Sequence, residues 1–190
     1  MPRPDSERVV DIALELMPRG RGVRIADLGA GTGCLICAIL HQRGGVEGVA
    51  VERDPGAAGL ARENTKALGL DARIDIFVGD WANWKDWETV DLIVSNPPYI
   101  ASQDIDTLAP TVSQYDPRQA LDGGSDGLSA YRSILMLAER KMKAESWLVL
   151  EIGHTQKLDV ESLMDAHGFT NIKTARDLGS RDRVVYGQRP

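Results

Sequence analysis

The sequence predicts an α/β protein with a mostly parallel, doubly wound sheet of seven strands. The first observation is that strand patterns and helix patterns alternate along nearly the whole chain, which is typical of parallel sheets. The second is a glycine-rich turn, Gly29-Ala30-Gly31-Thr32-Gly33, directly after the first apolar strand. The third is the turn Asn96-Pro97-Pro98-Tyr99, which ends another buried strand. Open α/β sheets bind their ligands at such strand ends.

The chain begins with an amphipathic helix pattern. Its apolar positions from Val9 to Met17 share one face, Asp5 or Ser6 can cap it, and Pro18 follows it. Strands are expected at residues 23–28, 46–51, 73–78, 91–94 and 147–152, and further helices at 34–42, 55–68, 127–143 and 155–167. The last two strands, 169–175 and 183–187, have no helix between them. We therefore expect an antiparallel hairpin that closes one edge of the sheet.

A long connection, residues 101–126, follows the proline turn and is interrupted by proline and glycine. Loops of this length inside a compact domain are usually functional or mobile. The segment 122–127, where this connection meets the next helix, has a faint likeness to a calcium loop, but Ser133 stands where the required glutamate would be. We therefore expect a turn and a helix cap there.

The composition indicates one soluble domain. The 190 residues suit a single core, and a net charge of −6 without a basic tract argues moderately against direct nucleic-acid binding. The chain has no apolar run near 18 residues and no signal-peptide pattern, so we expect a cytoplasmic protein without membrane contact, and we expect a monomer.

Metal binding is not predicted. His41, His154 and His167 are scattered and have no clustered acidic residues. Cys34 and Cys37 lie one turn apart in an expected helix, where they suit packing better than a disulfide or a metal site.

The glycine turn indicates the class of cofactor. A dinucleotide fingerprint would need glycine at position 34, where the chain has Cys34, and the Gly-Lys-Ser/Thr ending of a P-loop is absent. Asp27 followed by Gly29-x-Gly31-x-Gly33 resembles instead the turn that binds S-adenosylmethionine. Its backbone can approach a ligand closely and the following helix offers free N–H groups. Alone, this spacing also fits an ordinary tight strand–helix turn.

Residues at two further strand ends support the prediction that the chain binds S-adenosylmethionine. Glu52 ends the second strand, where a carboxylate can accept hydrogen bonds from both ribose hydroxyls. Asp80 and Trp81 end the third strand, where the carboxylate can accept from an adenine amino group and the indole can cover the adenine face. Each residue alone could be an ordinary surface side chain, but the three strand ends together favour a nucleoside-containing cofactor.

The proline turn suits the acceptor side of a methyl transfer. The Asn96 side-chain oxygen and the Pro97 carbonyl are two acceptors that fit a planar NH₂ group, and Tyr99 can stack on its face. Fixing both hydrogens directs the nitrogen lone pair at a methyl carbon, so catalysis would consist mostly of orientation and electrostatic preorganisation. No strong base is needed because the nitrogen becomes acidic once it is methylated. The alternative is that the prolines merely end a strand.

With these motifs, the chain resembles the catalytic domain of the peptide chain release factor glutamine N5-methyltransferases, within the Rossmann-like S-adenosylmethionine-dependent methyltransferases. The segments that carry the resemblance occur in the family's order and cover nearly the whole chain: PRPDSE at 2–7, DLGAGTG at 27–33, NPPYI at 96–100, PRQALDGGSDGL at 117–128, LEIGHTQ at 150–156 and RDLGSRDRVV at 176–185. The NPPY turn is shared with adenine and guanine N-methyltransferases, so PRQALDGGSDGL narrows the match.

The resemblance implies roles for individual residues. S-adenosylmethionine would be held by a set of residues from four strand ends: Asp27, Gly29, Ala30, Gly31, Thr32, Gly33, Glu52, Asp80, Trp81 and Asn96. Asn96, Pro97, Pro98 and Tyr99 would hold the substrate glutamine, with Asn96, Pro97 and Tyr99 catalytic, and no metal is implied. That glutamine belongs to the GGQ loop of a release factor, so the implied activity tunes translation termination. Glu52 stands where the family more often has aspartate.

The family's helical N-terminal docking domain has no counterpart in the sequence, so residues 1–190 are expected to form one S-adenosylmethionine-dependent methyltransferase domain. Three other functions stay open. The same turn could act on a ribosomal-protein glutamine. An adenine-N6 or guanine-N2 nucleic-acid methyltransferase would want a basic groove, which this acidic chain lacks. A non-catalytic S-adenosylmethionine-binding module would not need to keep the substrate acceptors.

Overall fold

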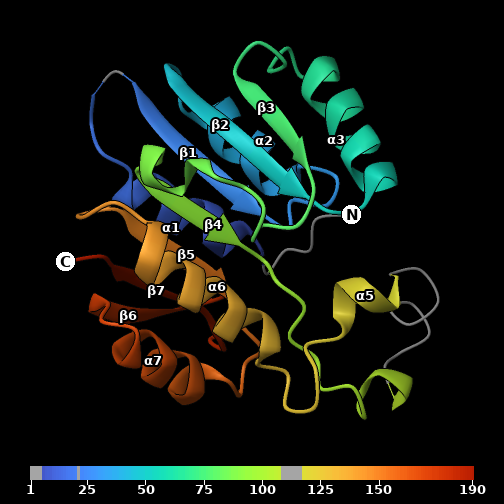
Figure 1. The fold of residues 1–190 in the computed structure, drawn as a ribbon, viewed down its shortest axis with the longest axis vertical. Helices are drawn as coiled ribbons and strands as arrows, with labels where there is room; N and C mark the ends of the chain where they lie inside the picture. Colours follow the sequence, from blue (N-terminus) through green and yellow to red (C-terminus); the bar gives the residue numbers. More distant parts are fainter. Residues whose placement is uncertain (1–5, 21, 108–116) are drawn as a thin grey trace.

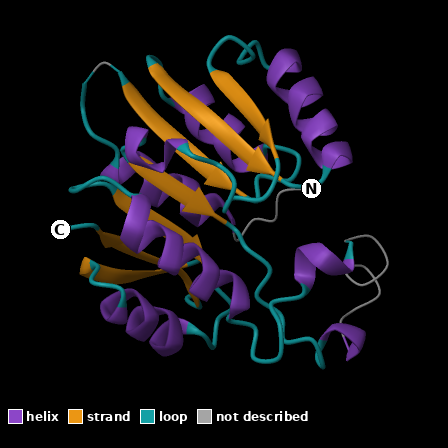
Figure 2. Ribbon diagram, viewed as in Figure 1, coloured by secondary structure: helices purple, strands orange, loops and turns teal. Residues whose placement is uncertain are grey.

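The computed structural model describes residues 6–20, 22–107 and 117–190. One seven-stranded sheet forms the centre of this part of the chain, with helices on both faces (Figures 1 and 2). The predicted fold class is therefore confirmed. The strands are β1 (Val23–Leu28), β2 (Val46–Glu52), β3 (Ile74–Val78), β4 (Leu92–Ser95), β5 (Trp147–Glu151), β6 (Thr170–Arg176) and β7 (Asp182–Gln188).

Helices connect most of these strands, as the alternating pattern predicts. They are α1 (Glu7–Leu16), α2 (Cys34–Gln42), α3 (Pro55–Ala67), α5 (Arg118–Leu121), α6 (Ser129–Lys141) and α7 (Lys157–Ala166), with short 3₁₀ helices η2 (Asp86–Thr89) and η3 (Ile105–Thr107). In the described ranges, no helix combines the length and the apolar character needed to cross a membrane.

The strand order is β3-β2-β1-β4-β5-β7-β6. The pairs β1/β2, β2/β3, β1/β4 and β4/β5 are parallel, whereas β7 runs antiparallel to both β5 and β6. The predicted C-terminal hairpin is confirmed, and β7 inserts between β5 and the edge strand β6. The chain leaves β1 towards β2 and returns through β4 on the other side, so the topological switch point lies between β1 and β4, where such sheets bind ligands.

Two apolar layers fix the sheet between its helices. On one face α1 and α2 pack against alternate strand residues, including Ile25 and Val94, which are fully buried. On the other face α6 and α7 pack with Trp87 and Ile93. Since the central strands are buried on both faces, they read as continuous apolar runs in the sequence.

The predicted cap of the first helix is wrong at Ser6. Ser6 occupies the N-cap position but has helical angles (φ −74°, ψ −13°) and its side chain makes no capping hydrogen bond. A capping side chain needs an extended backbone to reach the helix N–H groups. The Ser6 hydroxyl instead donates to Glu151 Oε2 at 2.6 Å. Asp5, the other predicted cap, lies outside the described residues.

The connection at 101–126 is more ordered than predicted where the structure describes it. It contains η3 and α5, and a bridge pairs Ile100 with Asp122. Pro110 and Asp116 lie outside the described residues. The predicted cap of α6 is wrong, because its N-cap is Leu128, whose side chain makes no capping bond. The expected turn is present, and Asp126 Oδ1 accepts from the Leu128 N–H at 3.1 Å.

Candidate active site

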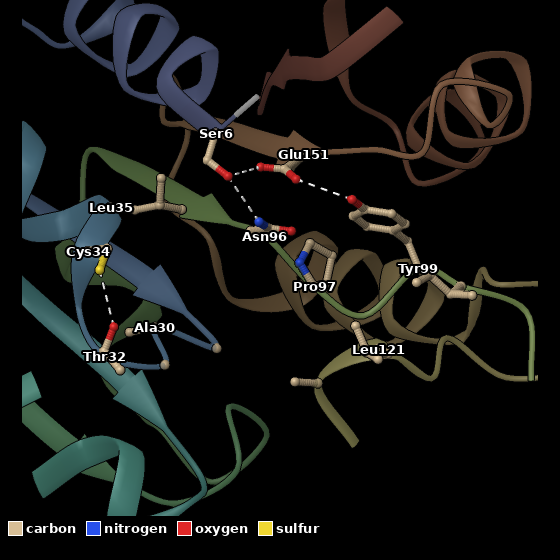
Figure 3. A pocket seen from close by; sticks show the side chains of 14 residues that line it. Ser6, Ala30, Thr32, Cys34, Leu35, Asn96, Pro97, Tyr99, Leu121 and Glu151 are labelled. Carbon is tan, nitrogen blue, oxygen red and sulfur yellow. Dashed lines mark hydrogen bonds between the residues drawn. The ribbon is translucent and has the colours of Figure 1, made fainter. Parts of the chain in front are cut away.

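The ends of β1 and β4 are held side by side at the switch point. The fully buried Ser95, the last residue of β4, donates through its hydroxyl to the Leu28 carbonyl at the end of β1, at 2.6 Å. The glycine turn and the proline turn therefore leave the sheet next to each other. Both line one cavity of about 230 Å³, together with residues from the start of α1, the end of β5 and α5 (Figure 3).

The glycine turn has the backbone that its sequence predicts. Gly29, Gly31 and Gly33 have φ values of +71°, +56° and +77°, a region that L side chains rarely adopt. Gly29, Ala30, Gly31 and Thr32 line the cavity, but Gly33 does not and faces α3 instead. The cavity wall on this side is therefore mostly main chain, which a ligand can approach closely.

Asp27 lies beneath this turn and is completely buried. Its Oδ2 accepts from the Ile36 N–H of α2 at 3.3 Å, whereas no described residue hydrogen-bonds to Oδ1. Its pKa is raised to about 7, mainly by burial; the Ile36 N–H lowers it and the nearby Glu52 carboxylate raises it within that net shift. Asp27 does not line the cavity, so its effect on a ligand there would be electrostatic.

Glu52 bonds the glycine turn but does not itself line the cavity. Its Oε2 accepts from the Gly31 N–H and its Oε1 from the Asp54 N–H, both at 2.8 Å. These bonds fix the carboxylate against the glycine turn, and each oxygen keeps acceptor capacity. The side chain itself is not part of the cavity lining, and only 8% of it is exposed.

The two residues predicted at the end of β3 differ in their placement. The Trp81 ring lies beside Gly29, since a Cβ there would be 3.5 Å from the indole, and Trp81 Nε1 donates to Ser133 Oγ at 3.2 Å. Asp80 is exposed, and its Oδ1 accepts from the Ala82 N–H at 2.8 Å. Neither lines the cavity, but Trp81 borders the glycine turn.

The proline turn presents three of its four residues to the cavity: Asn96, Pro97 and Tyr99. Asn96 Nδ2 donates to Ser6 Oγ at 3.2 Å, and Figure 3 shows the Asn96 oxygen turned away from Ser6. The Tyr99 hydroxyl donates to Glu151 Oε1 at 3.4 Å. Pro98 is partly exposed and does not line the cavity.

Several cavity residues were not predicted from the sequence. They lie on α1, α2, β5 and the connection after the proline turn: Ser6, Cys34, Leu35, Ile100, Ala120, Leu121 and Glu151. Glu151 ends a strand as Glu52 does, so the rule that ligands bind at the carboxyl ends of parallel strands could have predicted it. The sequence predicts a packing role for Cys34, but Cys34 lines the cavity and its Sγ lies 3.1 Å from Thr32 Oγ1.

The other weak candidates of the sequence lie apart from this cavity. Cys37 is buried in the core and, with His41, borders a second, mainly apolar cavity of about 550 Å³ between α2 and α3. His167 contacts Glu139 Oε2 at 2.7 Å. No group of three or more His, Cys, Asp or Glu side chains that could hold a metal occurs in the part of the chain that the structure describes.

Comparisons with known proteins support a methyltransferase. The family model for the methyltransferase small domain matches residues 6–162. Relatives named release factor glutamine methyltransferase include those of Caulobacter vibrioides, 41% identical over 98% of this chain, and Geobacter sulfurreducens, 40% identical over 99%. The chain spans 64% and 65% of the length of these two relatives.

Solved structures agree with this assignment. A release-factor-specific protein-(glutamine-N5) methyltransferase of Alicyclobacillus acidocaldarius is 27% identical, with a TM-score of 0.59 over 100% of this chain and 94% of that one. An RNA methyltransferase of Salinibacter ruber, in complex with S-adenosyl-L-homocysteine, has a TM-score of 0.64 over 100% and 93% of the two chains. At 17% identity, the second likeness shows the fold alone.

Proposed function

The chain belongs to the methyltransferase small domain family, among relatives named release factor glutamine methyltransferases, and we propose that it methylates the GGQ-loop glutamine of release factors. The methyl group would come from S-adenosylmethionine and the acceptor would be the side-chain amide nitrogen. The observation that carries this proposal is that the glycine turn and the proline turn line one cavity. A donor and an acceptor of a methyl group would thus meet within a single site.

The residues on the donor side fit S-adenosylmethionine. Positive φ angles at Gly29 and Gly31 leave bare main chain on the cavity wall, and the fixed carboxylate of Glu52 has acceptor capacity for ribose hydroxyls. Asp27 Oδ1 makes no hydrogen bond within the described chain, and its partial negative charge favours a cationic ligand nearby. When bound, S-adenosylmethionine supplies an electrophilic methyl group on a sulfonium sulfur.

On the acceptor side, the turn holds an amide by its two hydrogens. Asn96 Oδ1 and the Pro97 carbonyl accept the two N–H bonds, and Tyr99 packs against the amide plane. An amide nitrogen is a weak nucleophile because its lone pair is delocalised. Fixing both hydrogens orients that lone pair, and the two oxygens stabilise the positive charge that develops on nitrogen. The methylated nitrogen then loses one proton without needing a strong base.

Pro98 would act by its shape rather than by contact with the substrate. Two consecutive prolines restrict φ and remove two N–H groups, so the carbonyls of the turn stay unpaired by local backbone. Thr32, Gly33, Asp80 and Trp81 remain proposed cofactor contacts, because the first two belong to the glycine turn, Trp81 borders it and Asp80 precedes Trp81. Under this proposal, residues 1–190 form one methyltransferase domain.

Transfer of tritiated methyl groups tests the function. Purified protein with labelled S-adenosylmethionine should label a release factor but neither its GGQ→GGA variant nor tRNA or DNA. Label on a ribosomal protein in place of the release factor would identify a different glutamine substrate. Label on nucleic acid alone, or on the GGA variant, would refute the proposal.

The variant Asn96→Ala tests the role of the turn in the same assay. It should lower kcat by about 100-fold or more, as loss of one preorganised polar contact does. Its affinity for S-adenosylmethionine should fall less, because the cofactor would keep the glycine turn and Glu52, whereas the substrate amide would lose one of its two acceptors. An unchanged kcat would exclude Asn96 as the acceptor.

A further inference from the structure

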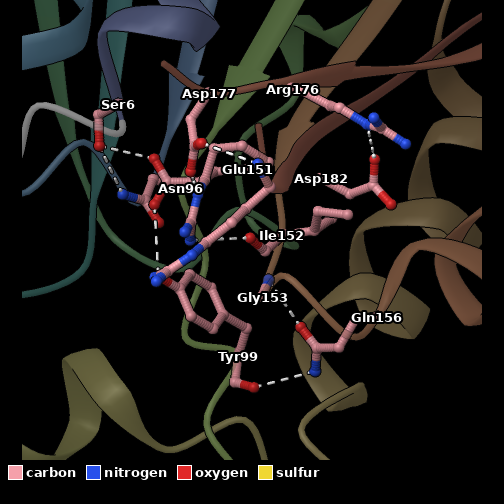
Figure 4. A network of polar contacts seen from close by, with 12 residues as sticks. Ser6, Asn96, Tyr99, Glu151, Ile152, Gly153, Gln156, Arg176, Asp177 and Asp182 are labelled. Atoms are coloured by element: carbon pink, nitrogen blue, oxygen red, sulfur yellow. Dashed lines mark hydrogen bonds and ion pairs between the residues drawn. The ribbon is translucent and has the colours of Figure 1, made fainter. Parts of the chain in front are cut away.

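We propose that Ser6 and Glu151 are positioning residues that determine which end of the Asn96 amide faces the substrate. The inference rests on the proposed function, since it assigns the Asn96 oxygen to a substrate amide. It assigns a role to two side chains, from the start of α1 and the end of β5, beside the turns that follow β1 and β4 (Figures 3 and 4).

Three side chains form a hydrogen-bonded chain across these elements. The Ser6 hydroxyl donates to Glu151 Oε2 at 2.6 Å, and Asn96 Nδ2 donates to Ser6 Oγ at 3.2 Å. Ser6 is only 6% exposed and Glu151 only 1%, so water competes little for these bonds. Glu151 Oε1 also accepts from the Tyr99 hydroxyl at 3.4 Å, so one carboxylate contacts both ends of this network.

The order of donors and acceptors in this chain allows only one orientation of Asn96. A carboxylate can only accept, so it takes the single hydroxyl proton of Ser6. Ser6 then offers Asn96 only lone pairs, and Asn96 must turn its NH₂ group towards Ser6. Its oxygen is thereby directed away from Ser6. Without Glu151, the two ends of the amide would be nearly equivalent in shape and either could face the cavity.

The orientation decides between two substrate side chains of equal shape. With its oxygen towards the substrate, Asn96 accepts from the NH₂ group of glutamine. With the amide reversed, it would place N–H groups against that NH₂ and would suit the carboxylate of glutamate instead. Ser6 and Glu151 would thus enforce selection of glutamine over glutamate, because a substrate that leaves polar groups of the site unpaired binds much more weakly.

Four variants separate this role from a merely structural one. Ser6→Ala removes the acceptor for Asn96, whereas Ser6→Thr keeps the hydroxyl. Glu151→Gln can donate its own N–H to Ser6 and so release the Ser6 proton towards Asn96, which permits the reversed amide. Ser146→Ala is the matched serine control, since Ser146 is also buried and its hydroxyl donates to the Lys143 carbonyl at 2.5 Å, directly before β5.

A matched control also exists for Glu151. Glu161 Oε1 accepts from the Thr174 hydroxyl at 2.5 Å, between α7 and the edge strand β6. Glu161→Gln therefore alters another carboxylate–hydroxyl pair outside the cavity lining. Both control variants should keep the kcat and the substrate selectivity of the unmodified chain.

The first measurement compares the binding of a release factor and its GGQ→GGE variant in the presence of S-adenosylhomocysteine, together with kcat. Ser6→Ala and Glu151→Gln should lower kcat by about tenfold or more and should reduce the preference for GGQ over GGE. Glu151→Gln should lose more of this preference, and Ser6→Thr should retain most of both properties. A preference unchanged in Ser6→Ala and Glu151→Gln would overturn the inference.

The second measurement needs no substrate and so separates the two proposals. In ¹⁵N-labelled protein, the side-chain NH₂ signals of Asn96 should shift and exchange faster in Ser6→Ala, but not in Ser146→Ala. Unchanged Asn96 signals in Ser6→Ala would refute the positioning role, even in a fully active protein. An unmodified chain that transfers no methyl group to release factors would instead refute the proposed function.

Discussion

Glu52 and Glu151 both end a parallel strand, yet they have different partners. The Glu52 oxygens accept from two backbone N–H groups, of Gly31 and Asp54, and so are fixed by the main chain itself. The Glu151 oxygens accept from the hydroxyls of Ser6 and Tyr99. One carboxylate therefore shapes the proposed cofactor side and the other the proposed substrate side.

The variant Glu52→Ala should weaken binding of S-adenosylmethionine by about 1–3 kcal/mol, the value of charged hydrogen bonds to the ribose. Titration calorimetry measures this directly. Glu47→Ala is the matched control, because Glu47 lies on the same strand but is exposed. A cofactor Kd equal in Glu52→Ala and the unmodified chain would exclude the ribose contact.

The raised pKa of Asp27 predicts a dependence of stability on pH. Because burial raises this pKa from 3.8 to about 7, the folded state favours the protonated acid. The stability contributed by that proton is complete below pH 3.8 and is lost as the pH rises through about 7. At higher pH the folded state holds a buried charge, an effect of at most about 4 kcal/mol.

The variant Asp27→Asn should lack this dependence of stability on pH, because the asparagine side chain carries no titrating proton. Between pH 5 and pH 8 the free energy of unfolding of the unmodified chain should fall relative to that of Asp27→Asn, because only the unmodified side chain titrates. Urea unfolding at several pH values gives both curves. Parallel curves over this range would contradict a raised pKa at Asp27.

At the scale of elements, one side chain joins the loops around the proline turn. Gln156, directly before α7, donates through Nε2 to the carbonyls of Tyr99 and Gly127, at 3.0 and 3.2 Å, and its Oε1 accepts from the Gly153 N–H at 3.0 Å. Gly127 has a φ of +75°, and a Cβ there would lie 2.5 Å from the Tyr99 oxygen. The loops before α6 and α7 therefore hold the proline turn in place.

The variant Gln156→Ala should destabilise the protein by about 1–3 kcal/mol, because three partly buried backbone groups lose their partner. It should lower kcat more than cofactor affinity, since the loosened loops adjoin only the substrate side. Gln188→Ala is the control, as Gln188 Nε2 bonds the Glu145 carbonyl at an exposed position. Equal kcat values for the two variants would show that Gln156 does not support the turn.

At the scale of the molecule, the site gathers residues from both halves of the sheet. The C-terminal hairpin is joined to the end of β5, because Arg183 Nη1 donates to the Ile152 carbonyl and its Nε contacts Asp177 Oδ2, both at 3.3 Å; Figure 4 shows Ile152 and Asp177. The Arg183 and Asp177 side chains are 8% and 6% exposed. A ligand at the switch point would therefore couple to elements that span the whole domain.

Binding of S-adenosylmethionine should consequently stabilise the entire fold. At a concentration of about 100 times Kd, a ligand that binds only the folded state adds about 2.7 kcal/mol. For a domain of this size, that should raise Tm by about 5–10 °C. Calorimetry should show the shift, and Glu52→Ala should show a smaller one at the same concentration. A Tm that does not respond to the cofactor would contradict binding.

Local sequence pattern predicted the fold and the two turns. The bounds of β1 and α2 agree with the prediction because apolar runs, a glycine turn and helix periodicity are properties of neighbouring residues. The alternation of elements predicted a parallel sheet, and the fold and the family resemblance are both confirmed. The roles assigned to the site residues stay predictions until the variants are measured.

The sequence by itself thus determined the seven strands, the longer helices between them and which chemistry the two turns suit, but not α5 and η3 in the connection after the proline turn. Only the tertiary structure decided that Ser6 bonds Glu151, 145 residues away, instead of capping its own helix. It likewise decided that α5 borders the cavity and that Cys34 lines it. The physical reason is that periodicity and turn chemistry act between neighbours in the chain, whereas side-chain partners depend on which strand ends the packed sheet brings together.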